Sequence, residues 1–309
     1  MNTPSDAVRD TGLESQATAP DISPARRFYW SMKREFWESR SIYLAPLAVA
    51  ALFLIGFLIS TIHLPQKMRA ATALGPAEQQ ALIEEPYNLA VLLLMGTAIV
   101  VAVFYSLDAL YGERRDRSIL FWKSLPVSDV TTVLAKATVP ILLLPLLEFA
   151  ITVVTQAIML LVSSAVLLGA GVSANPLWTQ LSLFSTWPAL FYHLVGIHGL
   201  WFAPFFGWLL LVSAWARRAP FLWAVLPGFV IAIVERIAFN TAHFANMLQS
   251  RISGGADDMV MTAGSSPMQR MLHVDVGRLL ASPGLWVGLG ITAAFLAAAV
   301  QLRRYRGPV

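Results

Sequence analysis

The chain has 309 residues, of which 57% are hydrophobic and only 13% are charged, and its mean hydropathy is +0.63. Because ordinary soluble domains carry roughly 25% charged residues, this composition excludes a soluble domain and indicates a membrane protein. The chain has no cysteine, which excludes a disulfide framework and thiolate metal sites. Its net charge of +4 comes from cations beside apolar runs and not from a basic domain, so we expect no nucleic-acid partner.

The amino-terminal segments predict a tail followed by an amphipathic helix. Residues 1–24 are rich in Ser, Thr, Asp, Ala and Pro and lack the apolar core of a cleaved signal peptide, so we expect a disordered cytoplasmic tail. In residues 25–41, Phe28, Met32 and Phe36 recur at four-residue spacing beside two tryptophans, which indicates a helix lying in the membrane interface. A simple positive flank to the first span is the alternative for this segment.

Six apolar stretches are long enough to cross a bilayer, whose hydrocarbon core of about 30 Å takes roughly 20 helical residues. They are residues 43–64, 88–110, 139–168, 188–216, 221–239 and 284–302. Pro140 and Pro145 predict an irregular start to the third stretch. The expected fold class is an all-α membrane protein with a six-span transmembrane domain over residues 42–302.

The distribution of Lys and Arg predicts the orientation, because cytoplasmic loops carry an excess of these residues. They cluster before the first span and between the second and third spans, at Arg26, Arg27, Lys33, Arg34, Arg40, Arg114, Arg115, Arg117, Lys123 and Lys136. We therefore expect the N and C termini, including the tail 303–309, and the loop 111–138 to be cytoplasmic. The segment 240–283 is then expected to be external.

The loop between the second and third spans combines charged residues, a short apolar helix and a proline. Residues 118–125 can form two turns of helix, and Pro126 disfavours its continuation. Much of its circumference is covered by the apolar residues Ile119, Leu120, Phe121, Trp122 and Leu125. Ser128 can cap a second helix after this break. From spacing alone two interpretations stay open: docking into a groove on a soluble partner, and an interfacial helix on lipid headgroups.

This loop resembles the first cytoplasmic loop of ABC-2 type transporter permeases, in which an acidic and basic cluster leads into a short coupling helix and a Ser-Leu-Pro-Val-Ser segment. The matching residues are Glu113, Arg114, Arg117, Ser118, Ile119, Ser124, Leu125, Pro126, Val127, Ser128 and Lys136. The position after the second span is similar too, as is the amphipathic helix before the first span. The resemblance covers most of the chain.

The resemblance implies the permease subunit of an ATP-binding cassette exporter in a cell membrane, such as a bacterial inner membrane. Two six-span subunits, the second being another copy or a paralogous permease, would form the translocation path. Cytosolic ATPase subunits would hold ATP and Mg²⁺ and dock on Arg117, Ser118, Ile119, Leu120, Phe121, Trp122, Lys123, Leu125 and Pro126. Their closure would move the coupling helix as a rigid lever. This chain has no phosphate-binding loop, so we expect a transport subunit without cofactor or enzymatic activity.

Ionisable groups inside apolar spans are costly and therefore attract functional hypotheses. Glu148 in the third span, with His193 and His198 in the fourth, are candidates for the translocation path or the subunit interface, and Glu148 is the foremost of them. Hydrogen bonding between helices is the alternative for the histidines. Glu235 and Arg236 in the fifth span are expected near the outer boundary, and the sequence assigns them no role.

Two other classes of function compete with transport. A membrane scaffold or channel subunit that uses no ATP would place the loop helix on lipid. An unrecognised intramembrane enzyme is the less favoured alternative, because the five histidines form no His-Glu-x-x-His zinc motif.

Overall fold

The computed structural model describes residues 23–71, 74–124, 127–181, 183–253 and 276–305. Within these ranges the chain forms helices and no strand. Nearly all of the predicted tail 1–24 lies outside the described residues, as do residues 254–275 of the predicted external segment and residues 306–309. The helical class expected from the composition is thus observed.

The helices of the described residues follow one another along the chain. In order they are α1 (Pro24–Glu38), α2 (Ser41–Ser60), η1 (Thr61–His63), α3 (Leu64–Ala71), α4 (Pro76–Asp108), α5 (Tyr111–Arg115), α6 (Ile119–Ser124), α7 (Asp129–Thr138), η2 (Val139–Leu143), α8 (Leu144–Gly169), α9 (Asn175–Gln180), α10 (Leu183–His193), η3 (Leu194–Trp201), α11 (Ala203–Trp215), α12 (Pro220–Phe239), α13 (His243–Ile252), α16 (Val276–Ala281) and α17 (Pro283–Tyr305). Of these, η1 is a 3₁₀-helix, whereas η2 and η3 are π-helices.

Among the described residues, five helical stretches are long and apolar enough to cross a membrane. They are Ser41–Ala71, Pro76–Arg115, Asp129–Gly169, Pro220–Phe239 and Pro283–Tyr305. A sixth results if Asn175–Trp201 and Ala203–Trp215, which meet at 44°, are counted as one bent span. These lengths and compositions fit a multi-pass membrane protein, and the predicted number of six spans depends on the bent pair.

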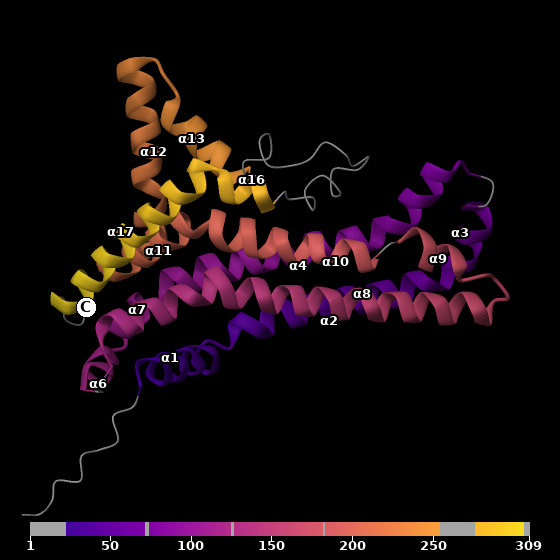
Figure 1. Ribbon diagram of the computed structural model, residues 1–309, viewed down its shortest axis with the longest axis horizontal. Coiled ribbons are helices and arrows are strands. Elements are labelled where there is room, and N and C mark those ends of the chain that lie inside the picture. The colour runs from indigo at the N-terminus through magenta and orange to yellow at the C-terminus, as the bar shows by residue number, and fades with distance from the viewer. Residues whose placement is uncertain (1–22, 72–73, 125–126, 182, 254–275, 306–309) are drawn as a thin grey trace, which may run out of the picture.

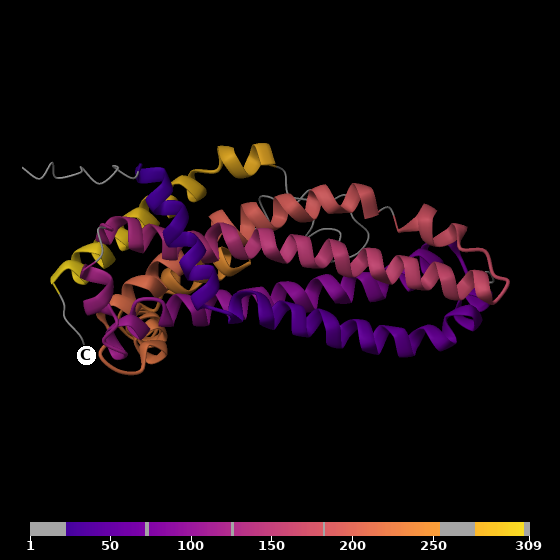
Figure 2. The same ribbon diagram turned by 90° about the horizontal axis from the view of Figure 1, so that it is seen from below.

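The molecule is elongated, with α2, α4 and α8 running side by side along its length (Figures 1 and 2). The helices α1 and α6 lie at one end with the last turns of α17, and α3 lies at the other end. In contrast to these packed helices, α12 projects away from the bundle and buries none of its residues.

Helix α1 occupies most of the segment predicted to lie in the interface. It begins at Ser23, whose side chain accepts a hydrogen bond from the Arg26 amide at 3.4 Å, and Pro24 fills the first helical position. Farther along the chain, Ser128 caps α7 by accepting from the Thr131 amide at 3.1 Å, which confirms the cap expected after the proline break.

Two π-helical segments meet in the middle of the fold. The first, η2, contains Pro140, in agreement with the irregular start predicted for the third span. The second, η3, passes so close to it that a Cβ atom on Gly199 would lie 2.4 Å from the Ile141 carbonyl oxygen. Glycine is therefore required at this crossing. π-Turns are rare and concentrate at functional sites, so η3 is a place to look for function.

Candidate functional site

Helix α6 is the element that the sequence assigns to coupling, and its apolar side chains divide between two faces. Leu120 and Phe121 are 61% and 60% exposed, whereas Ile119 is only 1% exposed. The Phe121 ring meets the Trp122 ring edge to face, with 4.9 Å between centroids. One face of α6 is thus packed on the protein, and the other carries an uncovered apolar pair.

A helix of six residues is too short to be stable alone, so α6 depends on its neighbours. The Arg34 guanidinium of α1 lies over the Trp122 ring, 4.1 Å from its centroid, in a cation–π contact. Lys123 Nζ donates a hydrogen bond of 3.4 Å to the Arg304 carbonyl oxygen of α17. These contacts hold α6 against both α1 and α17.

A cleft lies beside the contact between α1 and α6. It is lined by Trp30, Lys33, Arg34, Trp37, Glu38 and Trp122. Lys33 Nζ lies 5.0 Å from the Trp30 ring centroid and 4.7 Å from that of Trp37. Aromatic rings in contact with cations suit either a membrane interface or an interface with a protein partner.

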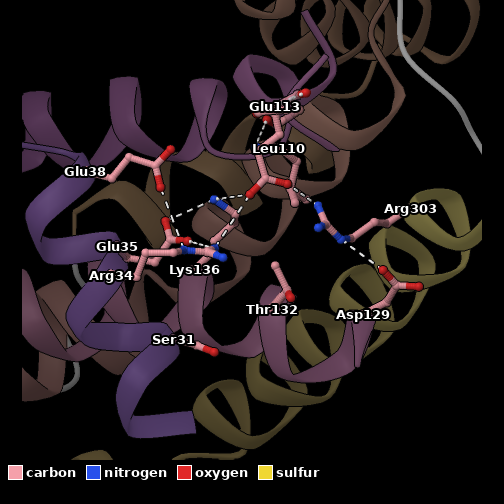
Figure 3. A network of polar contacts seen from close by, with 12 residues as sticks. Ser31, Arg34, Glu35, Glu38, Leu110, Glu113, Asp129, Thr132, Lys136 and Arg303 are labelled. Carbon is pink, nitrogen blue, oxygen red and sulfur yellow. Dashed lines mark hydrogen bonds and ion pairs between the residues drawn. The ribbon is translucent and has the colours of Figure 1, made fainter. Parts of the chain in front are cut away.

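Behind α6, a buried network of charged side chains joins α1, α5, α7 and α17 (Figure 3). Its centre is the Glu113 carboxylate of α5, which accepts a hydrogen bond from Arg303 and lies 3.1 Å from Lys136 Nζ. Arg34 Nη2 is 3.7 Å from the same carboxylate. Because Arg303 Nε also donates to Asp129 Oδ1 at 3.0 Å, this one arginine links α17 to both α5 and α7.

The Glu35 carboxylate of α1 forms the other half of the charged network. It accepts hydrogen bonds from Lys136 Nζ at 3.0 Å, from the Tyr105 hydroxyl at 3.1 Å and from Arg34. Burial alone raises the pKa of Glu35, but the charges of Lys136 and Arg34 outweigh it and hold the pKa below its ordinary value of 4.5. Buried charges are tolerated only when paired, and the buried Lys136 ammonium pairs with two carboxylates at once.

The neighbouring residues of α5 attach the charged network to α11. Arg114 Nη1 donates to the carbonyl oxygens of Ala214 and Ala216, at 2.7 and 3.0 Å, and so satisfies the last carbonyls of that helix. The Ser213 hydroxyl of α11 accepts from the amides of Leu110 and of the residue after it. The turn that carries Glu113 is therefore fixed from two sides.

The residues predicted to dock an ATPase do not form one surface. Arg117, Leu120, Phe121 and Lys123 are exposed, Ser118 and Trp122 are partly buried, Ile119 is buried, and Leu125 and Pro126 lie outside the described residues. The exposed members remain candidates for contact with a partner, whereas Ile119 and Trp122 hold the helix in place.

Most of the charged network was not foreseen from the sequence. Glu113 appears there only as a match to the loop pattern, Lys136 as such a match and as a cytoplasmic cation, Arg303 only within the tail 303–309, and Glu35 not at all. Glu35 does carry a signal, because it follows Ser31 by four residues and therefore shares the face that α1 buries.

The three ionisable residues predicted inside the membrane come together between α8 and η3. Glu148 Oε2 lies 4.0 Å from His198 Nδ1, and the rings of His198 and His193 are 5.4 Å apart at their centroids. All three side chains are buried within the single chain. This membrane cluster is formed by helices other than those that carry the charged network.

Glu235 has a local structural role that its sequence position did not reveal. Its carboxylate accepts hydrogen bonds from the Thr241 hydroxyl at 2.8 Å and from the amides of His243 and Phe244 at 2.6 and 2.9 Å. These amides open α13, so Glu235 caps that helix from the end of α12. The adjacent Arg236 is exposed.

Comparisons of the chain with family models, with curated proteins and with solved structures found no match.

Proposed function

We propose that this chain is the permease subunit of an ATP-driven exporter of the ABC-2 type, and that α6 is where a separate cytosolic ATPase docks. The observation that carries the proposal is the uncovered pair Leu120 and Phe121 on a helix whose opposite face is anchored to the protein. Binding hot spots favour large apolar or aromatic side chains on a rigid support, and α6 offers such a pair.

The charged network gives α6 a connection to the membrane helices. Displacement of α6 acts on α1 through Arg34 and on α17 through Lys123. The same Arg34 belongs to the charged network, which also contains α5 and α7. Because α5 extends α4 and α7 leads through η2 into α8, the pull of a partner on α6 reaches two of the long helices. Chains of packed helices and ion pairs can carry such coupling when they have two stable arrangements.

A second permease copy or a paralogous permease completes the translocation path in this proposal. Glu148, His193 and His198 are its candidate residues for the path or for the subunit interface. Since they are enclosed within one chain here, a path that reaches them requires α8 and η3 to separate. ATP and Mg²⁺ are bound by the partner, and this chain supplies binding and motion.

The test is co-purification with an ATPase that carries a phosphate-binding loop and is encoded beside this chain. Replacing Leu120 and Phe121 together by alanine should lower the recovered ATPase at least about tenfold, since loss of 1.4 kcal/mol weakens binding by that factor and hot-spot truncations cost about 2 kcal/mol or more. Phe184→Ala is the matched control, because Phe184 is 73% exposed on α10, away from α6. That variant should bind normally.

Two outcomes would count against the docking assignment. If the double variant is expressed, folded and still binds the ATPase as the wild type does, the partner does not use α6. If no adjacent ATPase is encoded and Phe121→Cys is protected from a water-soluble maleimide by lipid, α6 lies on the bilayer as in a scaffold or channel subunit.

A further inference from the structure

The membrane cluster contains a buried carboxylate that accepts no hydrogen bond from the described residues. Glu148 is 2% exposed, and neither of its oxygens accepts a hydrogen bond from any described residue. The Thr152 hydroxyl, one turn farther along α8, is also buried without a hydrogen-bond partner among those residues. This face of α8 thus presents two unsatisfied polar groups to the interior of the bundle.

The residues that flank Glu148 along α8 pack in apolar clusters. On one side Leu147 and Ile151 of α8 pack with Ala50 of α2 and Leu94 of α4. On the other side Phe149 packs against an apolar group formed by Val91, Met95, Leu190 and Leu194. An ionised carboxylate in such surroundings lacks the water and counter-charge that stabilise it, whereas a protonated carboxyl group carries no net charge.

The titratable groups nearest to Glu148 are two histidines, one in η3 and one at the end of α10. His198 Nδ1 is 4.0 Å away, and the His193 ring meets the His198 ring edge to face, with 5.4 Å between centroids. Among the described residues, the contact with His198 is the one ion-pair contact that Glu148 makes. No charged side chain of η2 or α3 pairs with Glu148. No three His, Asp or Glu side chains of the described chain gather closely enough to hold a metal ion. The smallest cation, a proton, needs no such ligand set.

We propose that Glu148 and His198 form a proton-binding site, with the proton on the Glu148 carboxyl group in this conformation. One proton from water adds to the carboxylate and gives a neutral acid beside a neutral imidazole. If η3 moves toward α8, the same proton can pass to His198 Nδ1 and leave a carboxylate beside an imidazolium. The pair binds one proton and has zero net charge in either arrangement.

The π-helical geometry of η3 explains how such a site can have two states. A shared proton requires an oxygen–nitrogen distance of about 2.7–2.9 Å, so the present 4.0 Å must shorten by about 1 Å for transfer. His198 is held at this distance because η3 rests on η2, where Gly199 touches the Ile141 carbonyl group. A small shift at that crossing changes the Glu148–His198 distance directly. The site does not depend on an ATPase partner.

The experiment is infrared difference spectroscopy of the purified full-length chain in lipid nanodiscs. At neutral pH the wild type should show the carbonyl stretch of a protonated carboxyl group, although an ordinary glutamic acid is protonated in only about one molecule in 500 at pH 7. Glu148→Gln should remove this band. Glu235→Gln is the matched control, because the Glu235 carboxylate already accepts three hydrogen bonds and should not contribute to the band.

Three further measurements complete the test. His198→Gln should shift the band without removing it, and a band of unchanged position would exclude His198 from the site. Glu148→Asp, which retains a carboxyl group at this position, should shift the band. It replaces Glu148→Gln as the test variant if Glu148→Gln does not fold. Absence of the band from the wild type, or its persistence in Glu148→Gln, would overturn the proposal. Because these measurements use the chain alone, their failure is distinguishable from failure of ATPase docking.

Discussion

At the residue scale, Lys136 connects two carboxylates of the charged network, Glu35 and Glu113. Its buried ammonium group lies 3.0 Å from Glu35 and 3.1 Å from Glu113. Removing one member of a buried ion pair leaves an uncompensated charge, which typically costs about 3–5 kcal/mol. We therefore expect Lys136→Met to lower the free energy of unfolding by that amount, measured by denaturant titration in detergent. Exposed Lys123→Met should change it little.

A rescue experiment separates loss of charge pairing from loss of packing. If the penalty arises from unpaired carboxylates, adding Glu35→Gln to Lys136→Met should restore part of the lost stability, since only Glu113 then lacks its lysine. Strictly additive losses in the double variant would assign the effect to packing of the lysine side chain.

The two glutamates of α1 are expected to change the stability of the fold with pH in opposite directions. The pKa of Glu35 is held below 4.5, so its stabilising contribution is present above that value and is lost as the pH falls through the lower folded-state pKa. Glu38, whose side chain is 48% exposed, has its pKa raised above 4.5, mainly by its partial burial, so its ionisation destabilises the fold at neutral pH and the penalty vanishes on acidification. Between pH 7 and pH 3, Glu35→Gln should reduce the fall in melting temperature.

The matched variant for this pH series is Glu38→Gln. It should raise the melting temperature at pH 7 and converge with the wild type at low pH. The same shape of curve for both variants would show that the two carboxyl groups do not differ as their surroundings predict.

At the scale of elements, the turn between α5 and α6 contains a strained residue. Arg117 has φ of 59°, a left-handed conformation that costs a non-glycine residue roughly 1–2 kcal/mol. Arg117→Gly should therefore raise the melting temperature, whereas Arg115→Gly, within helix α5, should lower it. If Arg117→Gly stabilises the chain but weakens ATPase recovery, the arginine side chain itself contacts the partner.

Elements with strong local signals were predictable from the sequence, whereas the contacts between those elements in the fold were not. Residues 118–125 read as a short helix because apolar residues precede Pro126, and α6 begins at Ile119 and ends at Ser124. Pro140 marked the irregular segment η2, but η3 has no proline, and its signal is the pair Gly196 and Gly199 at close approaches.

The charged network illustrates what local patterns omit. Glu35 and Lys136 are separated by 101 positions, and Glu113 and Arg303 by 190, so no periodicity within one segment relates them. Their pairing follows from the packing of α1, α7 and α17 at one end of the bundle. For the same reason Glu148 and His198 could each be singled out in the sequence, while their proximity required the fold.

At the scale of the whole molecule, the expected orientation places α6 on the cytoplasmic side and α3 on the opposite side. The natural absence of cysteine makes single introduced cysteines a clean test. Arg115→Cys should react with an impermeant maleimide only from the cytoplasm, and Lys67→Cys in α3, also exposed, only from outside. Labelling of both positions from the same side would overturn the orientation.

The positive and negative side chains of the charged network are equal in number. Its six central side chains comprise three cations, Arg34, Lys136 and Arg303, and three carboxylates, Glu35, Glu113 and Asp129. Moving a single unpaired charge across a membrane potential of 100 mV involves about 2.3 kcal/mol. A balanced group that moves as a unit does almost no such work, so rocking of this end of the bundle should proceed equally well in energised and in depolarised membranes.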